Sequence, residues 1–299
     1  MSLEQTMVNT YVTRVAHPPA AKANRSAHKE KMITRPVMRY PGGKYTLAKW
    51  VISHFPSHET YVELFGGAAS VLMRKPRSIG EVYNDLNGDV VNVFRVLRNH
   101  EQAAELARML ALTPYANEEY RLAYEPCDDP IERARRMIFR SFAGHGSDSV
   151  TRAHAGFRGH RNKESGVTAA QEWTSFPREI AVFTQRLQGV CIEQREAIKL
   201  VPVFDRPDTL YYADPPYLIS TRSSSSVKYG CEMTDADHEQ LSHVLHEVKG
   251  MAIVSGYPSE LYDRLYSGWR CILHAHRAQN AKRSTECLWL SPNIRTTLF

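Results

Sequence analysis

Residues 61–98 alternate between short apolar stretches and glycine or acidic turns, and this pattern leaves few possible folds. Tyr61–Phe65 reads as a strand, a Gly-Gly pair ends it, and the following stretch AASVLMRK has the pattern of a helix. A second strand, SIGEVYN, ends at Asp85, and an apolar-periodic helix is expected over residues 87–98. Strands that alternate with helices in this way are typical of a parallel sheet built from βαβ units. The sequence therefore predicts an α/β fold.

The turns of this unit also suggest what it binds. Gly66 and Gly67 follow the first strand directly, where the absence of side chains lets a ligand approach the backbone. Asp85 ends the next strand, 19 residues after Gly66. An acidic residue at about this spacing hydrogen-bonds a ribose hydroxyl in nucleoside-binding βαβ units. The glycine pair alone is weak evidence, but together with Asp85 it predicts a nucleoside site.

A second acidic turn lies in the stretch TLYYADPPY. Residues 209–213 are β-branched, aromatic or apolar and read as a buried strand, which the two prolines of the turn end. The proline-restricted backbone should hold Asp214 stiffly at the carboxyl end of this strand, where open α/β sheets bind ligands. Asp-Pro is also common in ordinary surface turns, and these residues alone leave both interpretations open.

The remaining regions differ in character. Residues 1–34 are polar and basic without periodicity, which predicts a disordered arm. Residues 101–200 are helical in pattern at both ends and rich in Gly, Ser, His and Arg between them, as expected of an inserted domain. The main domain would then comprise residues 35–100 and 201–299, with a capping box at the start of one helix, a strand MAIVSGY and a final antiparallel pair.

Charge is concentrated in two segments. Residues 1–44 and residues 131–163 each contain eight basic and two acidic residues, a balance of +6 in each. Since the whole chain carries +6, the remainder is −6 by subtraction. Basic segments on an acidic body favour a polyanionic partner, with nucleic acid the first candidate, although a basic tail can also be merely solvated.

Several classes of protein are disfavoured. The five cysteines are odd in number and widely spaced, which argues against a disulfide framework and against a zinc site and favours a reducing compartment. His243 and His246 have no obvious third ligand, so we expect no metal. GGKYT lacks the spacing of a phosphate-binding loop, and no Gly-x-Ser-x-Gly elbow occurs. Without a membrane-length apolar run or an apolar leader, the protein is expected to be cytoplasmic.

Four motifs in order resemble those of a known family. YPGGK near the start, VELFGGAASV, YNDLN and DPPY after a long insertion are similar to the motifs of the Dam-type, phage-like DNA adenine N6-methyltransferases. The resemblance covers about residues 36–299. It departs at Ala69, where the family usually has a second glycine. The resemblance implies a Rossmann-like methyltransferase fold that uses S-adenosylmethionine, with residues 101–200 as an inserted, largely helical target-recognition domain.

The resemblance also implies roles for particular residues. The turn Asp214, Pro215, Pro216 and Tyr217 would be catalytic and would hold an adenine flipped out of double-stranded DNA. Asp214 and the Pro215 carbonyl would accept the two hydrogens of the adenine amine, and Tyr217 would stack on the base. The residues implied for cofactor binding are Tyr40, Gly43, Lys44, Glu63, Phe65, Gly66, Gly67, Asp85 and Asp214.

The insertion is expected to supply the DNA contacts. Arginines suit phosphates and guanine edges alike, and four lie on or near the Gly-rich loop, namely Arg140, Arg152, Arg158 and Arg161. For any one of them, a role limited to phosphate or solvent is as plausible as base reading. We expect a monomer or weak dimer. The alternatives are transfer to another amino group, such as cytosine N4, RNA adenine or a protein glutamine, and an inactive DNA-binding relative.

Overall fold

A computed structural model of the 299-residue chain describes residues 33–146, 148–150, 156–159, 166–221, 231–277 and 283–294. All of these residues belong to one compact unit that starts at Met32. The predicted disordered arm, residues 1–34, lies outside the described residues except for its last two.

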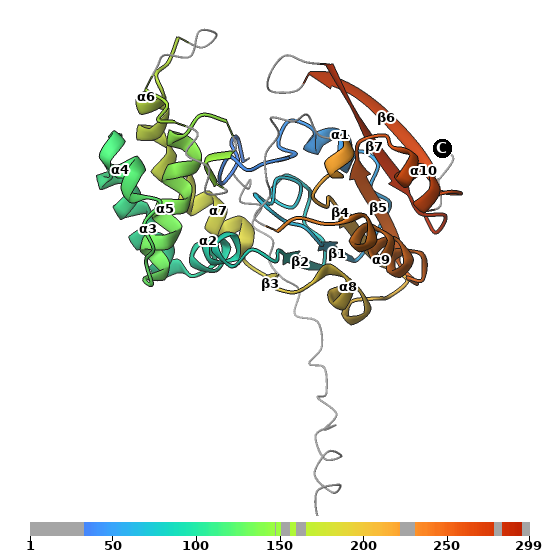
Figure 1. The fold of residues 1–299 in the computed structure, drawn as a ribbon. Coiled ribbons are helices and arrows are strands. Elements are labelled where there is room, and N and C mark those ends of the chain that lie inside the picture. The colour runs from blue at the N-terminus through green and yellow to red at the C-terminus, as the bar shows by residue number, and fades with distance from the viewer. Residues whose placement is uncertain are drawn as a thin grey trace, which may run out of the picture. The chain divides into compact units, whose positions relative to one another are not determined.

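A mixed sheet forms the centre of this unit (Figure 1). Among the described residues it has seven strands in the order β3-β2-β1-β4-β5-β7-β6. The first five strands in the chain pair in parallel, whereas β7 runs antiparallel to both β5 and β6. The predicted Rossmann-like α/β fold is confirmed. The strands are β1 Thr60–Glu63, β2 Gly80–Asn84, β3 Val190–Glu193, β4 Thr209–Ala213, β5 Met251–Gly256, β6 Arg270–Arg277 and β7 Arg283–Leu290.

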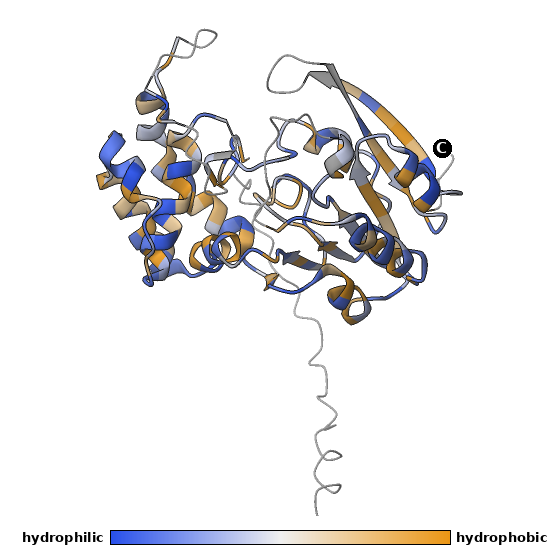
Figure 2. Ribbon diagram, in the orientation of Figure 1, coloured by the Kyte–Doolittle hydropathy of each residue, from blue (hydrophilic) through white to orange (hydrophobic). Residues whose placement is uncertain are grey.

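Helices cover both faces of the sheet and create two cores. Alternate strand residues such as Tyr61 and Tyr212 pack into one core, and their neighbours Val62 and Tyr211 pack into the other. Strands buried on both faces often read as continuous apolar runs, and Figure 2 shows such a run in orange along β5. The first core lies under α1 Ala48–Ile52, α2 Gly88–Arg98, α3 His100–Leu112, α4 Asn117–Leu122, α5 Pro130–Ala143, α6 Ala169–Ser175 and α7 Ile180–Leu187. The second lies under α8 Ala197–Leu200, α9 Asp235–His246 and α10 Glu260–Leu265.

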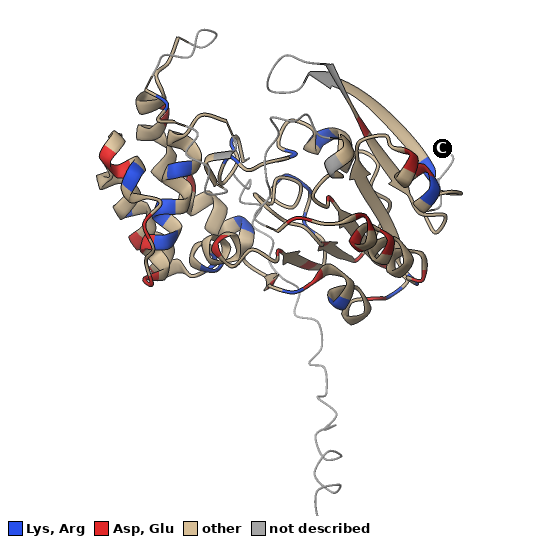
Figure 3. Ribbon diagram, viewed as in Figure 1, with Lys and Arg blue, Asp and Glu red and all other residues tan. Residues whose placement is uncertain are grey.

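The helix ends follow the expected capping chemistry. The side chain of Asn87 accepts the Asp89 N–H at the start of α2, and Thr234 and Asp237 form the predicted capping box of α9. Basic and acidic side chains are interleaved along α3 to α5 (Figure 3). Among the helices that the structure describes, none combines the length and the apolar character that crossing a bilayer requires.

Two details of the sequence prediction were wrong. The stretch AASVLMRK forms consecutive turns instead of a helix, because the Glu63 carboxylate takes the Leu72 N–H at 2.8 Å and Ala69 has a φ of 53°. Residues 190–193 pair with β2 and so belong to the sheet, not to the inserted segment 101–200. A four-residue strand is too short for its alternation to be recognised in the sequence. The division into a catalytic and a target-recognition domain remains a prediction.

A buried ion network joins the helical segment, which comprises α3 to α7 (residues 100–187), to the sheet. Arg186 of α7 donates to both oxygens of Glu81 on β2, at 2.6 and 2.9 Å. Lys75 donates to the same carboxylate at 2.7 Å. All three side chains are nearly inaccessible to solvent. Glu81 is therefore the shared acceptor of two buried cations, and burial of those cations depends on it.

We expect Glu81→Ala to destabilise the protein more than Arg186→Met does. Removing the carboxylate leaves two buried cations side by side, at a cost of about 3–5 kcal/mol, whereas Arg186→Met leaves Glu81 paired with Lys75. Urea unfolding gives both free energies. Glu105→Ala breaks an exposed ion pair with Arg108 and serves as the control, with an expected loss much smaller than that of either buried variant. Equal losses in the two buried variants would refute the shared role of Glu81.

Candidate active site

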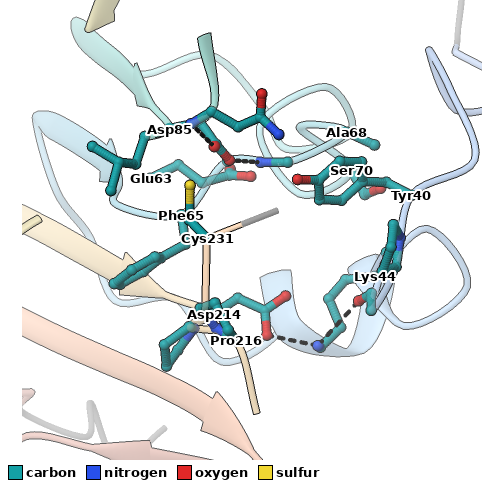
Figure 4. Close-up of a pocket in the computed structure, with 18 of the residues that line it drawn as sticks. Tyr40, Lys44, Glu63, Phe65, Ala68, Ser70, Asp85, Asp214, Pro216 and Cys231 are labelled. Atoms are coloured by element: carbon teal, nitrogen blue, oxygen red, sulfur yellow. Dashed lines mark hydrogen bonds and ion pairs between the residues drawn. The ribbon is translucent and has the colours of Figure 1, made fainter. Parts of the chain in front are cut away.

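A cavity of about 840 Å³, open to solvent at its mouth, lies at the carboxyl ends of β1, β2 and β4 (Figure 4). This is a topological switch point of the sheet, because β2 and β4 flank β1 on opposite sides. Every residue predicted for cofactor binding lines this cavity, together with Pro215 and Pro216. The structure thus brings together the four motifs of the sequence, and Lys44 and Asp214, which are 170 residues apart, are in direct contact.

The glycine turn is shaped by its own aromatic neighbours. A Cβ on Gly66 would lie 2.1 Å from the ring of buried Tyr83, so only glycine fits there. Gly67 has a φ of 48°, and a Cβ on it would lie 2.9 Å from the Tyr40 ring. From the sequence, these glycines were expected to let a ligand approach the backbone, and in the structure both are also required by packing. Ala69, the departure from the family pattern, adopts a left-handed backbone conformation that favours glycine.

Asp85 closes this turn with its carboxylate. One oxygen accepts the Gly67 N–H at 2.8 Å and the other accepts the Asn87 N–H at 2.8 Å. Burial raises the pKa of Asp85, and the backbone hydrogen bonds from Asn87, Gly67 and Leu86 oppose that rise. Asp85 therefore couples the end of β2 to the glycine turn while its side chain lines the cavity.

Asp214 stands on the opposite wall, at the end of β4. Its Oδ1 atom accepts a hydrogen bond from Lys44 Nζ at 2.6 Å and another from Ser255 Oγ at 2.7 Å. Both hydrogen bonds, from Lys44 and from Ser255, are therefore made to the same carboxylate oxygen. Figure 4 shows the second oxygen of Asp214 pointing into the cavity. A carboxylate anchored through one oxygen presents the other as a fixed hydrogen-bond acceptor.

Tyr217 lies behind this wall, whereas the sequence argument expected it to offer a stacking surface. Its side chain is 7% exposed, and its hydroxyl donates to Glu286 at 2.9 Å and accepts a short hydrogen bond from Lys44. The Tyr257 ring lies 4.4 Å away between centroids. In this structure Tyr217 acts as a link between buried polar groups, and its stacking on a base remains a prediction.

Glu63 is a buried carboxyl at the end of β1. Its Oε2 atom accepts hydrogen bonds from the Tyr61 hydroxyl at 2.7 Å and from the Leu72 N–H at 2.8 Å. Burial raises the pKa of Glu63 to about 8, against the smaller opposing effect of these two hydrogen bonds. The group is therefore largely protonated at neutral pH.

The predicted DNA-binding arginines have different surroundings. Arg140 hydrogen-bonds the carbonyls of Ala123 and Val150, both at 3.3 Å, so it serves the internal packing of the helical segment. Arg158 pairs with Glu172 at 2.9 Å. Arg152 and Arg161 lie outside the described residues. The structure therefore gives Arg140 a packing role, and a DNA contact by any of the four stays a prediction.

Sequence reasoning missed several residues of the site. Ser255, at the end of β5, contacts Asp214, and Glu286, in β7, contacts its partner Lys44. A serine or a glutamate inside an otherwise apolar strand is a signal that could have found both. Other residues that line the cavity and were not predicted are Pro41, Gly42, Ala68, Ser70, Val71, Leu86, Asn87, Tyr212, Cys231, Glu232 and Met233. Within the part of the chain that the structure describes, no group of three His, Cys, Asp or Glu side chains forms a metal site.

Comparison with known proteins agrees with this geometry. Fold and cavity define a methyltransferase-like α/β protein, and residues 40–281 match the family described as D12 class N6 adenine-specific DNA methyltransferase. The chain belongs to this family.

Curated relatives carry the corresponding name. The chain is 23% identical over 239 residues to a DNA adenine methylase of Serratia marcescens, covering 76% of this chain and 85% of that protein. It is 24% identical over 253 residues to one of Vibrio cholerae, covering 78% and 85%, and 24% identical over 224 residues to one of Escherichia coli, covering 73% and 76%. The predicted family is confirmed, and the family assignment makes the chain an adenine-specific DNA methyltransferase.

We expect the stability of the protein to fall with rising pH because of Glu63. Its pKa is about 8 in the folded chain against an ordinary 4.5, so between these values only the folded state keeps the proton. The free energy of unfolding should therefore be greatest below about pH 4.5 and decrease up to about pH 8 as far as this group is concerned. Glu63→Gln keeps an acceptor for Tyr61 and Leu72 but does not titrate, so it should lack this decrease.

Urea unfolding of the parent and of Glu63→Gln at several pH values between about 5 and 8 measures the effect. Other titrating groups are common to both proteins, so the difference between their free energies isolates Glu63. A difference that stays constant across this range would show that Glu63 has an ordinary pKa.

Proposed function

We propose that this chain transfers the methyl group of S-adenosylmethionine to N6 of an adenine in double-stranded DNA, with Asp214 and the Pro215 carbonyl as the acceptors that position the amine. The observation that carries the proposal is the Asp214 carboxylate, which is held through Oδ1 by Lys44 and Ser255 while its second oxygen points into the cavity. Family membership supports the reaction, and the cavity supports the choice of residues.

The cavity suits the cofactor in its chemistry. The Phe65 and Leu86 side chains offer apolar walls for a purine. The Asp85 carboxylate lies at the end of β2, where a ribose would sit in a nucleoside-binding βαβ unit. When bound, S-adenosylmethionine supplies a methyl group on a positively charged sulfur, which leaves as a neutral thioether.

Asp214 would prepare the amine for attack. The lone pair of an exocyclic amine is delocalised into the base, which makes the nitrogen a weak nucleophile. If Asp214 accepts one N–H and the Pro215 carbonyl accepts the other, the nitrogen is drawn toward tetrahedral geometry and its lone pair is aimed across the cavity. A nitrogen–carbon bond forms as the carbon–sulfur bond breaks, and one of the two amine protons is released to solvent at the open mouth of the cavity. Both prolines keep these acceptors fixed.

The helical segment would recognise the target sequence. Three arginines surround one acidic residue near the cavity: Arg158 and Arg39 pair with the Glu172 carboxylate at 2.9 and 3.5 Å, and Arg35 donates to the Glu172 carbonyl at 3.3 Å. This excess of positive charge supports a role in contacting DNA phosphates. Two of these arginines lie in residues 35–39 and the third lies in the predicted insertion, so DNA would contact both of these segments.

We expect Asp214→Ala and Asp214→Asn to be equally damaging. Lys44 and Ser255 both donate to Oδ1, so an asparagine should turn its carbonyl oxygen toward them and its NH₂ group toward the cavity. A donor there cannot accept the amine hydrogen, and the single-turnover rate constant should fall at least about 10²- to 10³-fold in both variants. The assay is methylation of a short duplex with saturating labelled cofactor. Asp263→Asn, at an exposed position on α10, is the charge-matched control. Near-parental rates in Asp214→Ala would refute the proposed reaction geometry.

We expect Asp85→Ala to weaken cofactor binding by about 10- to 100-fold, because a charged hydrogen-bond acceptor is lost and the Gly67 N–H loses its partner. Titration calorimetry with S-adenosylmethionine measures the dissociation constant. Asp89→Ala removes a half-exposed carboxylate at the start of α2, away from the cavity, and should leave the constant within about 2-fold. An unchanged constant in Asp85→Ala would remove Asp85 from the cofactor site.

A further inference from the structure

Glu286 is a buried acid that the reaction geometry described above does not use. It lies in β7, is 1% exposed, and precedes four buried residues, Cys287 to Leu290. Burying a carboxylate in such a strand is costly unless hydrogen bonds and opposite charge compensate it. The side chains that compensate it are therefore informative.

Those side chains are the ones behind Asp214. The Tyr217 hydroxyl lies 2.9 Å from Glu286 Oε1 and 3.2 Å from Oε2, and Lys44 Nζ lies 3.5 Å from Oε1. The same Lys44 ammonium lies 2.6 Å from Asp214 Oδ1 and also donates to the Tyr217 hydroxyl. One ammonium group is thus shared between two carboxylates, and this cluster joins β7, the turn after β4 and the segment before α1.

This arrangement has two consequences for Asp214. Because Tyr217 gives its hydrogen to Glu286, the lone pairs of its oxygen are left to accept from Lys44, which fixes the direction of the ammonium group. A lysine paired with Asp214 alone would neutralise that carboxylate and weaken it as an acceptor. A second carboxylate beside the lysine offsets part of this effect.

We propose that Glu286 is a positioning residue for methyl transfer: through Tyr217 and Lys44 it sets both the orientation and the negative charge of Asp214. This rests on the proposed role of Asp214 in holding the adenine amine. Glu286 touches neither the base nor the cofactor in this account.

The charged state of Glu286 should appear in the pH dependence of the reaction. Burial raises the pKa of Glu286, the Asp214 charge acts in the same direction, and Lys44 opposes both. As pH falls through this raised pKa, Glu286 becomes neutral. The positive charge of Lys44 then acts on the Asp214 carboxylate without the offset from Glu286, so the methyl-transfer rate should fall. The titratable groups that face Glu286 from the surrounding elements are Lys44, Asp214, Tyr217, Tyr212, Tyr262, Cys287 and the cross-strand neighbour His274.

The test is Glu286→Gln in the full chain, measured by single-turnover methylation of a short duplex with saturating labelled S-adenosylmethionine as a function of pH. The amide keeps an acceptor for Tyr217 but removes the charge. Above the pKa of Glu286 we expect the rate constant to be lower by about 10- to 100-fold, with dissociation constants for cofactor and DNA within about 2-fold of the parent values. The decrease in rate at acidic pH that Glu286 causes should be absent. Glu286→Asp, which restores the charge, should recover part of the rate. Glu239→Gln, exposed on α9, is the charge-matched control.

Tyr217→Phe provides a second route that leaves Glu286 in place. It removes the hydroxyl that links Glu286 to Lys44, so its rate loss should overlap with that of Glu286→Gln, and the double variant should be no slower than the slower single variant. A rate constant in Glu286→Gln within about 2-fold of the parent at every pH would overturn the proposal, and so would a uniform loss at all pH values that is accompanied by weaker binding. If Asp214→Ala also kept its rate, the proposed reaction geometry itself would fail; loss in Asp214→Ala alone would reject only the role of Glu286.

Discussion

The Lys44 ammonium group is the interaction on which the candidate active site depends. It is almost fully buried, and besides the neighbouring Gly42 carbonyl it contacts Asp214, Tyr217 and Glu286, which come from distant parts of the chain. A buried ammonium is stable only with such partners, and each partner is in turn held by it. The carboxyl end of β4, the segment before α1 and strand β7 therefore take up one mutual arrangement, and the cavity wall is its result.

The opposite wall is organised by backbone hydrogen bonds instead of charge. Asp85 binds the N–H groups of Gly67 and Asn87, and the Tyr83 hydroxyl donates to the Gly67 carbonyl at 2.8 Å. The turn after β1 is thus tied to the end of β2 by the buried Tyr83 and the half-buried Asp85. Glu63 adds a further tie by accepting the Leu72 N–H, which is also why residues 68–75 cannot continue as a regular helix. The hydrogen bonds that shape this wall of the cavity also hold it rigid.

Much of this structure could be predicted from the sequence, because the informative signals are local. Apolar runs ended by Gly66, by Asp85 and by the Pro215-Pro216 pair identify three parallel strands, and the carboxyl ends of such strands meet at one edge of the sheet. What could not be predicted depends on contacts between distant residues. Glu286 and Tyr217 are 69 residues apart in the sequence, and no periodicity in either segment predicts their hydrogen bond. The burial of Tyr217 follows from the same contact, which is why a stacking role looked natural in the sequence alone.

Residues 35–44 physically connect the helical segment to the cavity. At one end, Arg35 and Arg39 hydrogen-bond α6 through Glu172 and Ser175, and the Arg39 N–H lies 3.3 Å from the Ser141 hydroxyl of α5. At the other end, Lys44 contacts Asp214. Ten residues therefore join the proposed DNA-contacting arginines to the proposed amine acceptor without passing through the sheet. If DNA phosphates replaced Glu172 as the partner of Arg39 and Arg158, the change would act directly on the segment that carries Tyr40 and Lys44. Recognition of DNA and completion of the site would then be two effects of one short stretch of chain.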